Sequence, residues 1–154
     1  MRRPRARAPS SSAALFDVVD GPGGWSDEVG YGAGEARPAF VVVTSALPAS
    51  LRLTGLDWTF VTTGLADAVA AARERAEEAS ERSGTELDTV LMGGAATIRS
   101  AFDAGLVDVV SLHLAPVVLG AGTPLFTGAA PRTLVQRSVT PTSTATHLTY
   151  EVLR

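Results

Sequence analysis

Two adjacent glycines, Gly93 and Gly94, carry the clearest signal for chemistry in this sequence. They follow an apolar run at residues 89–92, which predicts a buried strand, and they precede a predicted helix that starts at Ala95. Glycine lets a ligand approach the backbone without a Cβ atom, and a helix start offers free N–H groups and a positive dipole end. Thr97 adds a hydroxyl in the first turn. The pattern indicates a phosphate or pyrophosphate site, although it is not G-x-G-x-x-G, and a tight turn without a ligand explains it equally well.

A second candidate consists of two hydroxyl side chains, Thr44 and Ser45, at the end of a predicted strand over residues 40–44. Ligands of open α/β sheets bind outside the carboxyl ends of the strands, so these hydroxyls fit a sugar or a phosphate. Taken alone, the two residues are better explained as a turn stabilised by hydroxyl–backbone hydrogen bonds.

Other reactive groups are scarce. The chain has no cysteine and no lysine, which excludes thiol nucleophiles, thiolate metal sites and Schiff bases. We interpret His113, in an apolar run, as a core or interface residue, and we expect His147 on the polar face of the last strand. No acid–base pair stands out, so the catalytic residues stay unknown and no metal site is predicted. Hydride transfer is compatible with this, because there a cofactor carries the reaction.

Composition limits the class of protein. The 154 residues suffice for one domain, and 45% hydrophobic against 19% charged residues excludes global disorder. No apolar run reaches the ~20 residues that span a membrane. Residues 1–14 are predicted to be a disordered basic tail, and residues 15–154 a domain. Without the four arginines of the tail the chain is acidic, which argues against a nucleic-acid partner.

The periodicity predicts alternating strands and helices. Strands are expected at residues 40–44, 58–62, 89–92, 107–117, 134–139 and 144–153, and helices at 65–82 and 95–104. Thr63 is the expected N-cap of the first of these helices. Trp25 and Tyr31 lie in a loop rich in Gly and Pro, where they either line a pocket or pin the loop to the body. This order predicts an α/β sheet whose last strands are antiparallel.

The run VLMGGAATIRSAFDAGLVDVVSLHLAPVVLGAGTPLF, at residues 90–126, resembles the reductase domain of bacterial riboflavin-biosynthesis deaminase-reductases. The closing THLTYEVLR is similar to the last strand of that family, and residues 16–45 resemble its small stand-alone members. The resemblance covers residues 15–154. It implies a dihydrofolate-reductase-like α/β fold, with a mixed, mostly parallel sheet flanked by helices.

The resemblance implies an NAD(P)H-dependent reductase that transfers hydride from nicotinamide to a small heterocyclic or sugar-linked substrate, similar to 5-amino-6-(5-phosphoribosylamino)uracil. The residues implied at the cofactor phosphates are Gly93, Gly94, Ala95 and Thr97, and those at the adenosine ribose and its 2′-phosphate are Thr44 and Ser45. Ala46 stands where the family often has a basic residue, so NADPH and NADH both stay open. The loop at residues 120–124 is implied near the nicotinamide and the substrate.

The resemblance also implies that the family's first strand–helix–strand, which holds much of its active site, is lacking here. We therefore keep two alternatives: a catalytically impaired nucleotide-binding remnant, and a dimeric scaffold that pairs through the long strands after Val107. The expected partners are a small-molecule substrate and a second copy in a homodimer, with no nucleic acid and no membrane. The expected location is cytoplasmic.

Overall fold

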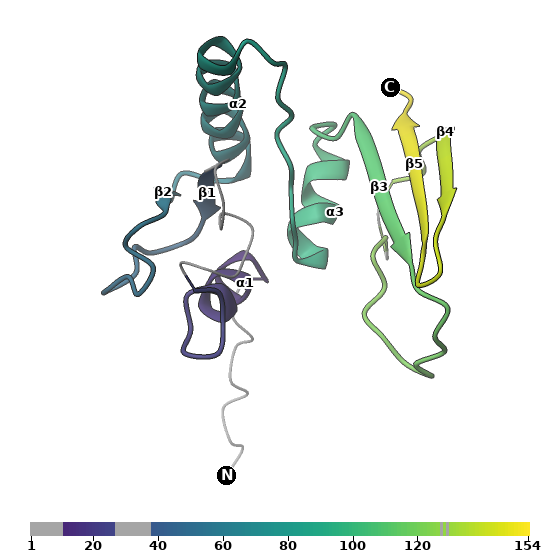
Figure 1. The fold of residues 1–154 in the computed structure, drawn as a ribbon, viewed down its shortest axis with the longest axis horizontal. Coiled ribbons are helices and arrows are strands. Elements are labelled where there is room, and N and C mark those ends of the chain that lie inside the picture. The colour runs from purple at the N-terminus through teal and green to yellow at the C-terminus, as the bar shows by residue number, and fades with distance from the viewer. Residues whose placement is uncertain (1–10, 27–37, 127, 129) are drawn as a thin grey trace. The chain divides into compact units, whose positions relative to one another are not determined.

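The computed structural model describes residues 11–26, 38–126, 128 and 130–154 (Figure 1). Its elements are α1 (Ser11–Val19), β1 (Ala39–Val43), β2 (Asp57–Val61), α2 (Leu65–Ser83), α3 (Ala95–Asp103), β3 (Val109–Leu114), β4 (Leu134–Pro141) and β5 (Thr146–Val152). The chain divides into two compact units, Met1–Thr97 and Ile98–Arg154. No helix in the described ranges is long and apolar enough to cross a membrane.

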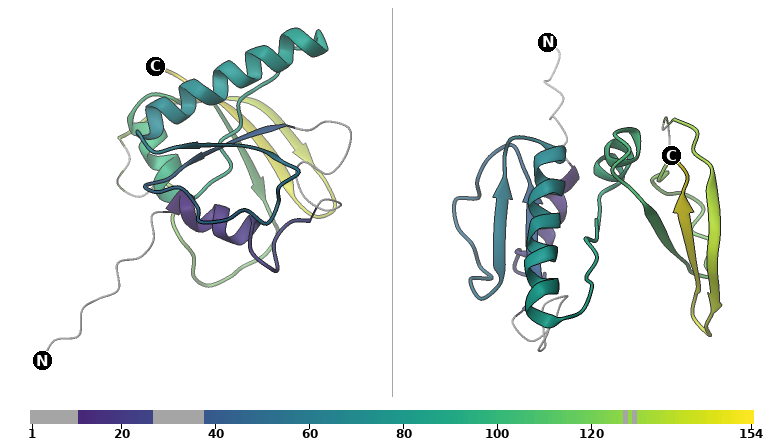
Figure 2. Two further views of the ribbon diagram at one scale, coloured as in Figure 1. Left: turned by 90° about the vertical axis from the view of Figure 1, so that its left-hand side faces the viewer. Right: turned by 90° about the horizontal axis from the view of Figure 1, so that it is seen from above.

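The first unit is built on a parallel pair of strands. Strands β1 and β2 are in register from Ala39 opposite Asp57 to Val43 opposite Val61. Helix α1 contacts β1, and helix α2 contacts both strands. Figure 2 (left) shows α1 and α2 on opposite sides of the pair. Each face of the two strands is therefore covered by a helix, as the apolar runs predict for buried strands.

Five aromatic side chains fill the side of the pair that α1 covers. Phe16 of α1 meets Trp58 and Phe60 of β2 edge to face, with ring centroids 5.4 and 5.3 Å apart. The ring centroid of Phe40 in β1 lies 5.0 Å from that of Trp58 and 5.7 Å from that of Trp25. Such pairs add about 0.5–1.5 kcal/mol each beyond the area that they bury. The contact with Phe40 shows that Trp25 pins its loop to the body, whereas Tyr31 lies outside the described residues.

A clamp between Asp20 and Arg52 ties the end of α1 to the loop between the strands. The Asp20 carboxylate accepts hydrogen bonds from the backbone N–H groups of Arg52 at 2.9 Å and of Leu53 at 2.8 Å. In return, the Arg52 guanidinium donates to the carbonyls of Asp20, at 2.8 Å, and of Val19 and Trp25. Leu53 is 2% exposed, so one of the bonded N–H groups belongs to a core residue.

Replacing Asp20 with alanine should therefore lower the free energy of unfolding by about 1–3 kcal/mol, because two N–H groups lose their acceptor. Asp17 is the matched control, since it carries the same charge three residues earlier, on α1, and lines the same open pocket as Asp20. Its replacement by alanine should change the free energy of unfolding by less than about 0.5 kcal/mol. Urea denaturation of the two variants measures both values, and equal losses would show that the clamp contributes nothing.

Helix α2 matches its predicted range closely, but its cap differs. Gly64 with φ 124° is the N-cap, and no side chain caps the helix, so the expectation for Thr63 is wrong. Gly84 ends the helix in the left-handed conformation, and its N–H donates to the carbonyl of Ser80 at 2.9 Å.

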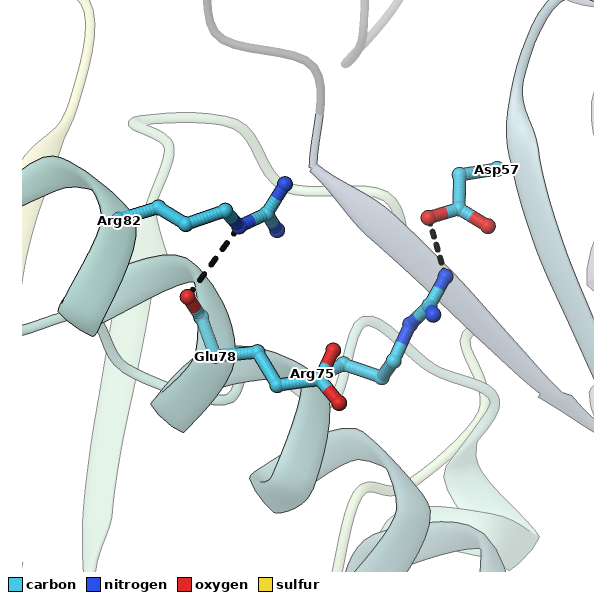
Figure 3. Close-up of polar contacts among 4 residues, drawn as sticks. All are labelled: Asp57, Arg75, Glu78 and Arg82. Atoms are coloured by element: carbon cyan, nitrogen blue, oxygen red, sulfur yellow. Dashed lines mark hydrogen bonds and ion pairs between the residues drawn. The ribbon is translucent and has the colours of Figure 1, made fainter.

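Helix α2 also pairs with the strand before it through an ion pair between Arg75 and Asp57 (Figure 3). Further along the helix, the Arg82 Nε donates to the carbonyl oxygen of Glu78 at 3.2 Å. The side chains of Arg75 and Asp57 are 35% and 54% exposed. Exposed pairs of this kind contribute about 0–1 kcal/mol, so packing rather than charge holds α2 in place.

The strand predicted at residues 89–92 is not formed. The segment lies outside every described sheet, and Val90 and Met92 are 63% and 48% exposed. A strand exists only through the hydrogen bonds of a neighbouring strand, and no described strand pairs with this segment. Its apolar composition alone therefore gave a wrong prediction.

The second unit carries a three-stranded antiparallel sheet in the order β3-β5-β4. The antiparallel ending of the chain is confirmed, although β3 is shorter than the predicted strand at 107–117. The expected single, mostly parallel sheet is corrected, because β1 and β2 are the only described strands that pair in parallel. Without strand pairing at residues 89–92, the described strands form two sheets instead of one.

Helix α3 confirms the helix predicted at residues 95–104 to within one residue. It ends at Asp103, Gly105 in the following turn has φ 67°, and the Leu106 N–H donates to the carbonyl of Ala101 at 2.9 Å. Ala101 and Phe102 are buried, and Phe102 meets Phe126 edge to face at 5.1 Å. These contacts form the small core of the second unit.

Helix α1 begins inside the segment that was predicted to be a disordered basic tail. The helix begins at Ser11, so the last four residues of the segment assigned to the tail are helical. Residues 1–10 lie outside the described part of the chain, and the prediction for them stays a prediction.

Candidate functional site

The two glycines form the tight turn into α3 that their spacing predicts. Gly93 has φ 151°, a conformation that residues with a side chain rarely adopt. A Cβ built on Gly93 would lie 3.4 Å from Cδ2 of Leu15, so the turn lies against α1. Gly93, Gly94, Ala95 and Thr97 are all half-buried. The backbone of this turn is therefore accessible on one side and supported on the other.

The start of α3 offers electrostatics that suit an anion. The N–H groups of the first helical turn have no acceptor within the helix, and the helix dipole is positive at this end. The first turn of α3 contains no acidic side chain, whereas Asp67 lies in the first turn of α2. The start of α3 is therefore the better place for a phosphate, and its residues fit the pyrophosphate of a dinucleotide.

Thr44 and Ser45 directly follow β1, at the carboxyl end of the parallel pair. The Thr44 N–H donates to the carbonyl of Val61 at 3.0 Å. The Thr44 hydroxyl donates to the carbonyl of Ala46 at 2.9 Å and accepts the Ala46 N–H at 3.4 Å. This is the hydroxyl–backbone turn that the sequence favours at these two residues, and the hydroxyl uses its only proton in it. Ser45 is exposed.

An open pocket of about 320 Å³ lies in the first unit, beside the loop that Thr44 begins. Its lining residues are Phe16, Asp17, Asp20, Gly21 and residues 48–50. The two carboxylates repel a phosphate, and the Asp20 carboxylate is already bonded to the backbone of the loop. The pocket is therefore unsuitable for the anionic part of a cofactor.

The structure brings the predicted site residues together only in part. Gly93, Gly94, Ala95 and Thr97 share one turn, but the hydroxyl of Thr44 is bonded within its own turn. The loop at residues 120–124 is exposed, and its role stays a prediction. Among the described residues no group of three or more His, Cys, Asp and Glu side chains forms a metal site.

The Asp20–Arg52 clamp was not predicted from the sequence, and of the two alternatives for His113 only one is excluded. The partners of the clamp are 32 residues apart, and no local pattern links them. His113 is exposed, because the side chains of β3 alternate and its buried face carries Val110; this excludes the core alternative, and the interface alternative stays a prediction. Strands were predicted at residues 107–117 and 144–153. Pairing these two strands antiparallel would have placed His113 beside His147.

These features define a mixed α/β domain with a glycine turn at the start of a helix. The RibD C-terminal domain family matches residues 19–148, and the chain belongs to that family. No protein of curated function matches the chain in sequence.

A solved structure shows the same fold, and a second is reported with it. A protein provisionally named for riboflavin biosynthesis, from Shewanella sp. PV-4, superposes with a TM-score of 0.56 at 18% identity, over 75% of this chain and 61% of its own. A pyrimidine reductase-like protein from Corynebacterium diphtheriae gives a TM-score of 0.44 at 21% identity, over 74% of this chain and 50% of its own. The chain thus spans between half and two thirds of the length of these two proteins.

Proposed function

We propose that this chain acts as an NAD(P)H-dependent reductase on a small heterocyclic, sugar-linked substrate, in a step of riboflavin biosynthesis. The observation that carries the proposal is the family match over residues 19–148, which contains the whole glycine turn. The protein provisionally named for riboflavin biosynthesis has the same fold, which supports the proposed place in riboflavin biosynthesis.

In this proposal the turn from Gly93 to Thr97 binds the cofactor phosphates. Gly93 allows the positive φ of the turn, and the first N–H groups of α3 donate to the phosphate oxygens. Thr97 adds a hydroxyl on the first turn of the helix. The cofactor supplies the hydride, and these residues hold it in place.

The experiment is a thermal melt of the purified chain with increasing NADPH. A ligand that binds only the folded state adds about 2.7 kcal/mol at a hundredfold excess over its Kd. The proposal predicts a cooperative melt whose midpoint rises with NADPH concentration, and loss of the reduced-nicotinamide absorbance when substrate is added. A rise without turnover would favour the nucleotide-binding remnant. A melt that NADPH leaves unchanged would contradict the proposal.

The preference between NADPH and NADH should be weak. The Thr44 hydroxyl donates to Ala46, and the chain offers no basic side chain directly after Ser45. A charge-assisted hydrogen bond contributes about 1.5–3 kcal/mol, so its absence at the 2′-phosphate removes at least a tenfold preference. Fluorescence titrations should give Kd values for the two cofactors within about tenfold of each other. A much larger preference for NADPH would show that another cation recognises the 2′-phosphate.

A further inference from the structure

The chain contains two histidines, and the fold places them side by side on the second unit. His113 of β3 and His147 of β5 are direct partners in the antiparallel register. Their ring centroids are 4.5 Å apart and their planes are inclined by 73°. His113 is exposed and His147 is half-buried, so both rings are accessible to a solute. Within the described part of the chain, neither imidazole takes part in a hydrogen bond or an ion pair with another side chain.

We propose that His113 and His147 form a two-histidine site for a divalent transition-metal ion of the Ni²⁺ or Cu²⁺ type. Neutral imidazole is the commonest protein ligand of such ions. Opposite residues of an antiparallel pair have Cβ atoms about 4.5–5.5 Å apart, so both rings can reach one ion without a change in the backbone. The remaining coordination positions are left to water, because no third ligand group occurs among the described residues.

The ring separation decides which geometry the site supports. An imidazole nitrogen binds such an ion at about 2.0–2.1 Å, which places the ring centroid about 3.2 Å from the metal. Two rings in neighbouring positions, about 90° apart at the ion, then have centroids about 4.5 Å apart; tetrahedral positions require about 5.2 Å. The observed separation is 4.5 Å. The rings therefore stand at the separation that neighbouring positions on an octahedral or tetragonal ion require, whereas tetrahedral Zn²⁺ requires the side chains to rotate apart.

A bound ion would join β3 to β5 and so stabilise the sheet of the second unit. The two strands are already paired from Val109 opposite Glu151 to Leu114 opposite Thr146. Because the ligands come from two strands, the ion binds the folded sheet more tightly than the unfolded chain, and binding must raise the stability of the fold.

The test is isothermal titration of the full chain with NiCl₂, CuCl₂ and ZnCl₂, each alone. We expect one ion per chain, with Ni²⁺ and Cu²⁺ bound more tightly than Zn²⁺. His113→Asn and His147→Asn should each weaken Ni²⁺ binding at least tenfold, because either change leaves a single imidazole. Glu151→Gln is the control, since Glu151 lies on β5 and is engaged by Arg137; this variant should bind Ni²⁺ as the wild type does.

One further measurement keeps the proposal falsifiable if a variant fails to fold. Electron paramagnetic resonance of the Cu²⁺-loaded wild type should show coupling to two equivalent nitrogens. Three results would each overturn the proposal. The first is a loss of only about twofold in Ni²⁺ affinity in each histidine variant, and the second is coupling of Cu²⁺ to a single nitrogen. The third is loss of Ni²⁺ binding in Glu151→Gln. No binding of Ni²⁺ or Cu²⁺ would also overturn it.

Discussion

Gly93→Ala is expected to weaken NADPH binding about 10- to 100-fold. The new Cβ would lie 3.4 Å from Leu15, and φ 151° is a conformation that alanine rarely adopts, so the backbone of the turn must move. Losing one charge-assisted hydrogen bond to a phosphate, at about 1.5–3 kcal/mol, gives this range. Fluorescence titration of the variant with NADPH measures the effect.

Gly84→Ala is the matched control for backbone strain. Gly84 also has a positive φ, 66°, but it ends helix α2 and a Cβ there meets no atom within 4 Å. The control should lose about 1 kcal/mol of stability and keep the affinity of the wild type for NADPH. Equal affinity of Gly93→Ala and Gly84→Ala would remove the turn from the cofactor site.

Trp58→Ala is expected to cause the largest loss of stability, about 3 kcal/mol. Trp58 contacts the rings of Phe16, Phe40 and Phe60, and its Nε1–H donates to the carbonyl of Leu53 at 2.8 Å. Replacement of a packed tryptophan with alanine costs about 3–5 kcal/mol, and the half-buried ring belongs at the lower end. The Tm should fall by about 6–12 °C for a chain of this size.

Trp58→Phe separates packing from hydrogen bonding. Phenylalanine keeps most of the aromatic contacts but loses the bond to Leu53, so the cost should be about 1 kcal/mol. Calorimetry of both variants provides the comparison. If Trp58→Phe were as unstable as Trp58→Ala, the hydrogen bond rather than the aromatic cluster would hold the first unit together.

The local elements of the fold could be predicted because their signals are local. The helical period and Gly84 define α2, and Gly105 defines the end of α3 in the same way. The run at residues 89–92 has an equally clear composition, yet it forms no strand. Whether a strand forms depends on its neighbours, and that information is distributed over the chain.

The local part of the candidate site could be predicted from the sequence, but the long-range contact of the first unit could not. The spacing of Gly93, Gly94 and Thr97 predicts a turn into a helix, and that turn is present with the positive φ that glycine permits. The tie between Asp20 and Arg52 depends on tertiary packing across 32 residues, so no sequence pattern announces it. The cofactor itself is a proposal that rests on this turn and on the family.

The most direct test of the central claim is an amide NMR titration of the isotopically labelled chain with NADPH. If the turn binds the cofactor phosphates, the amide signals of Gly93, Gly94, Ala95 and Thr97 should shift most, in step with the shift of the phosphorus signals. Saturating NADPH that leaves these four signals in place, or that shifts only those at the start of α2, would contradict the account.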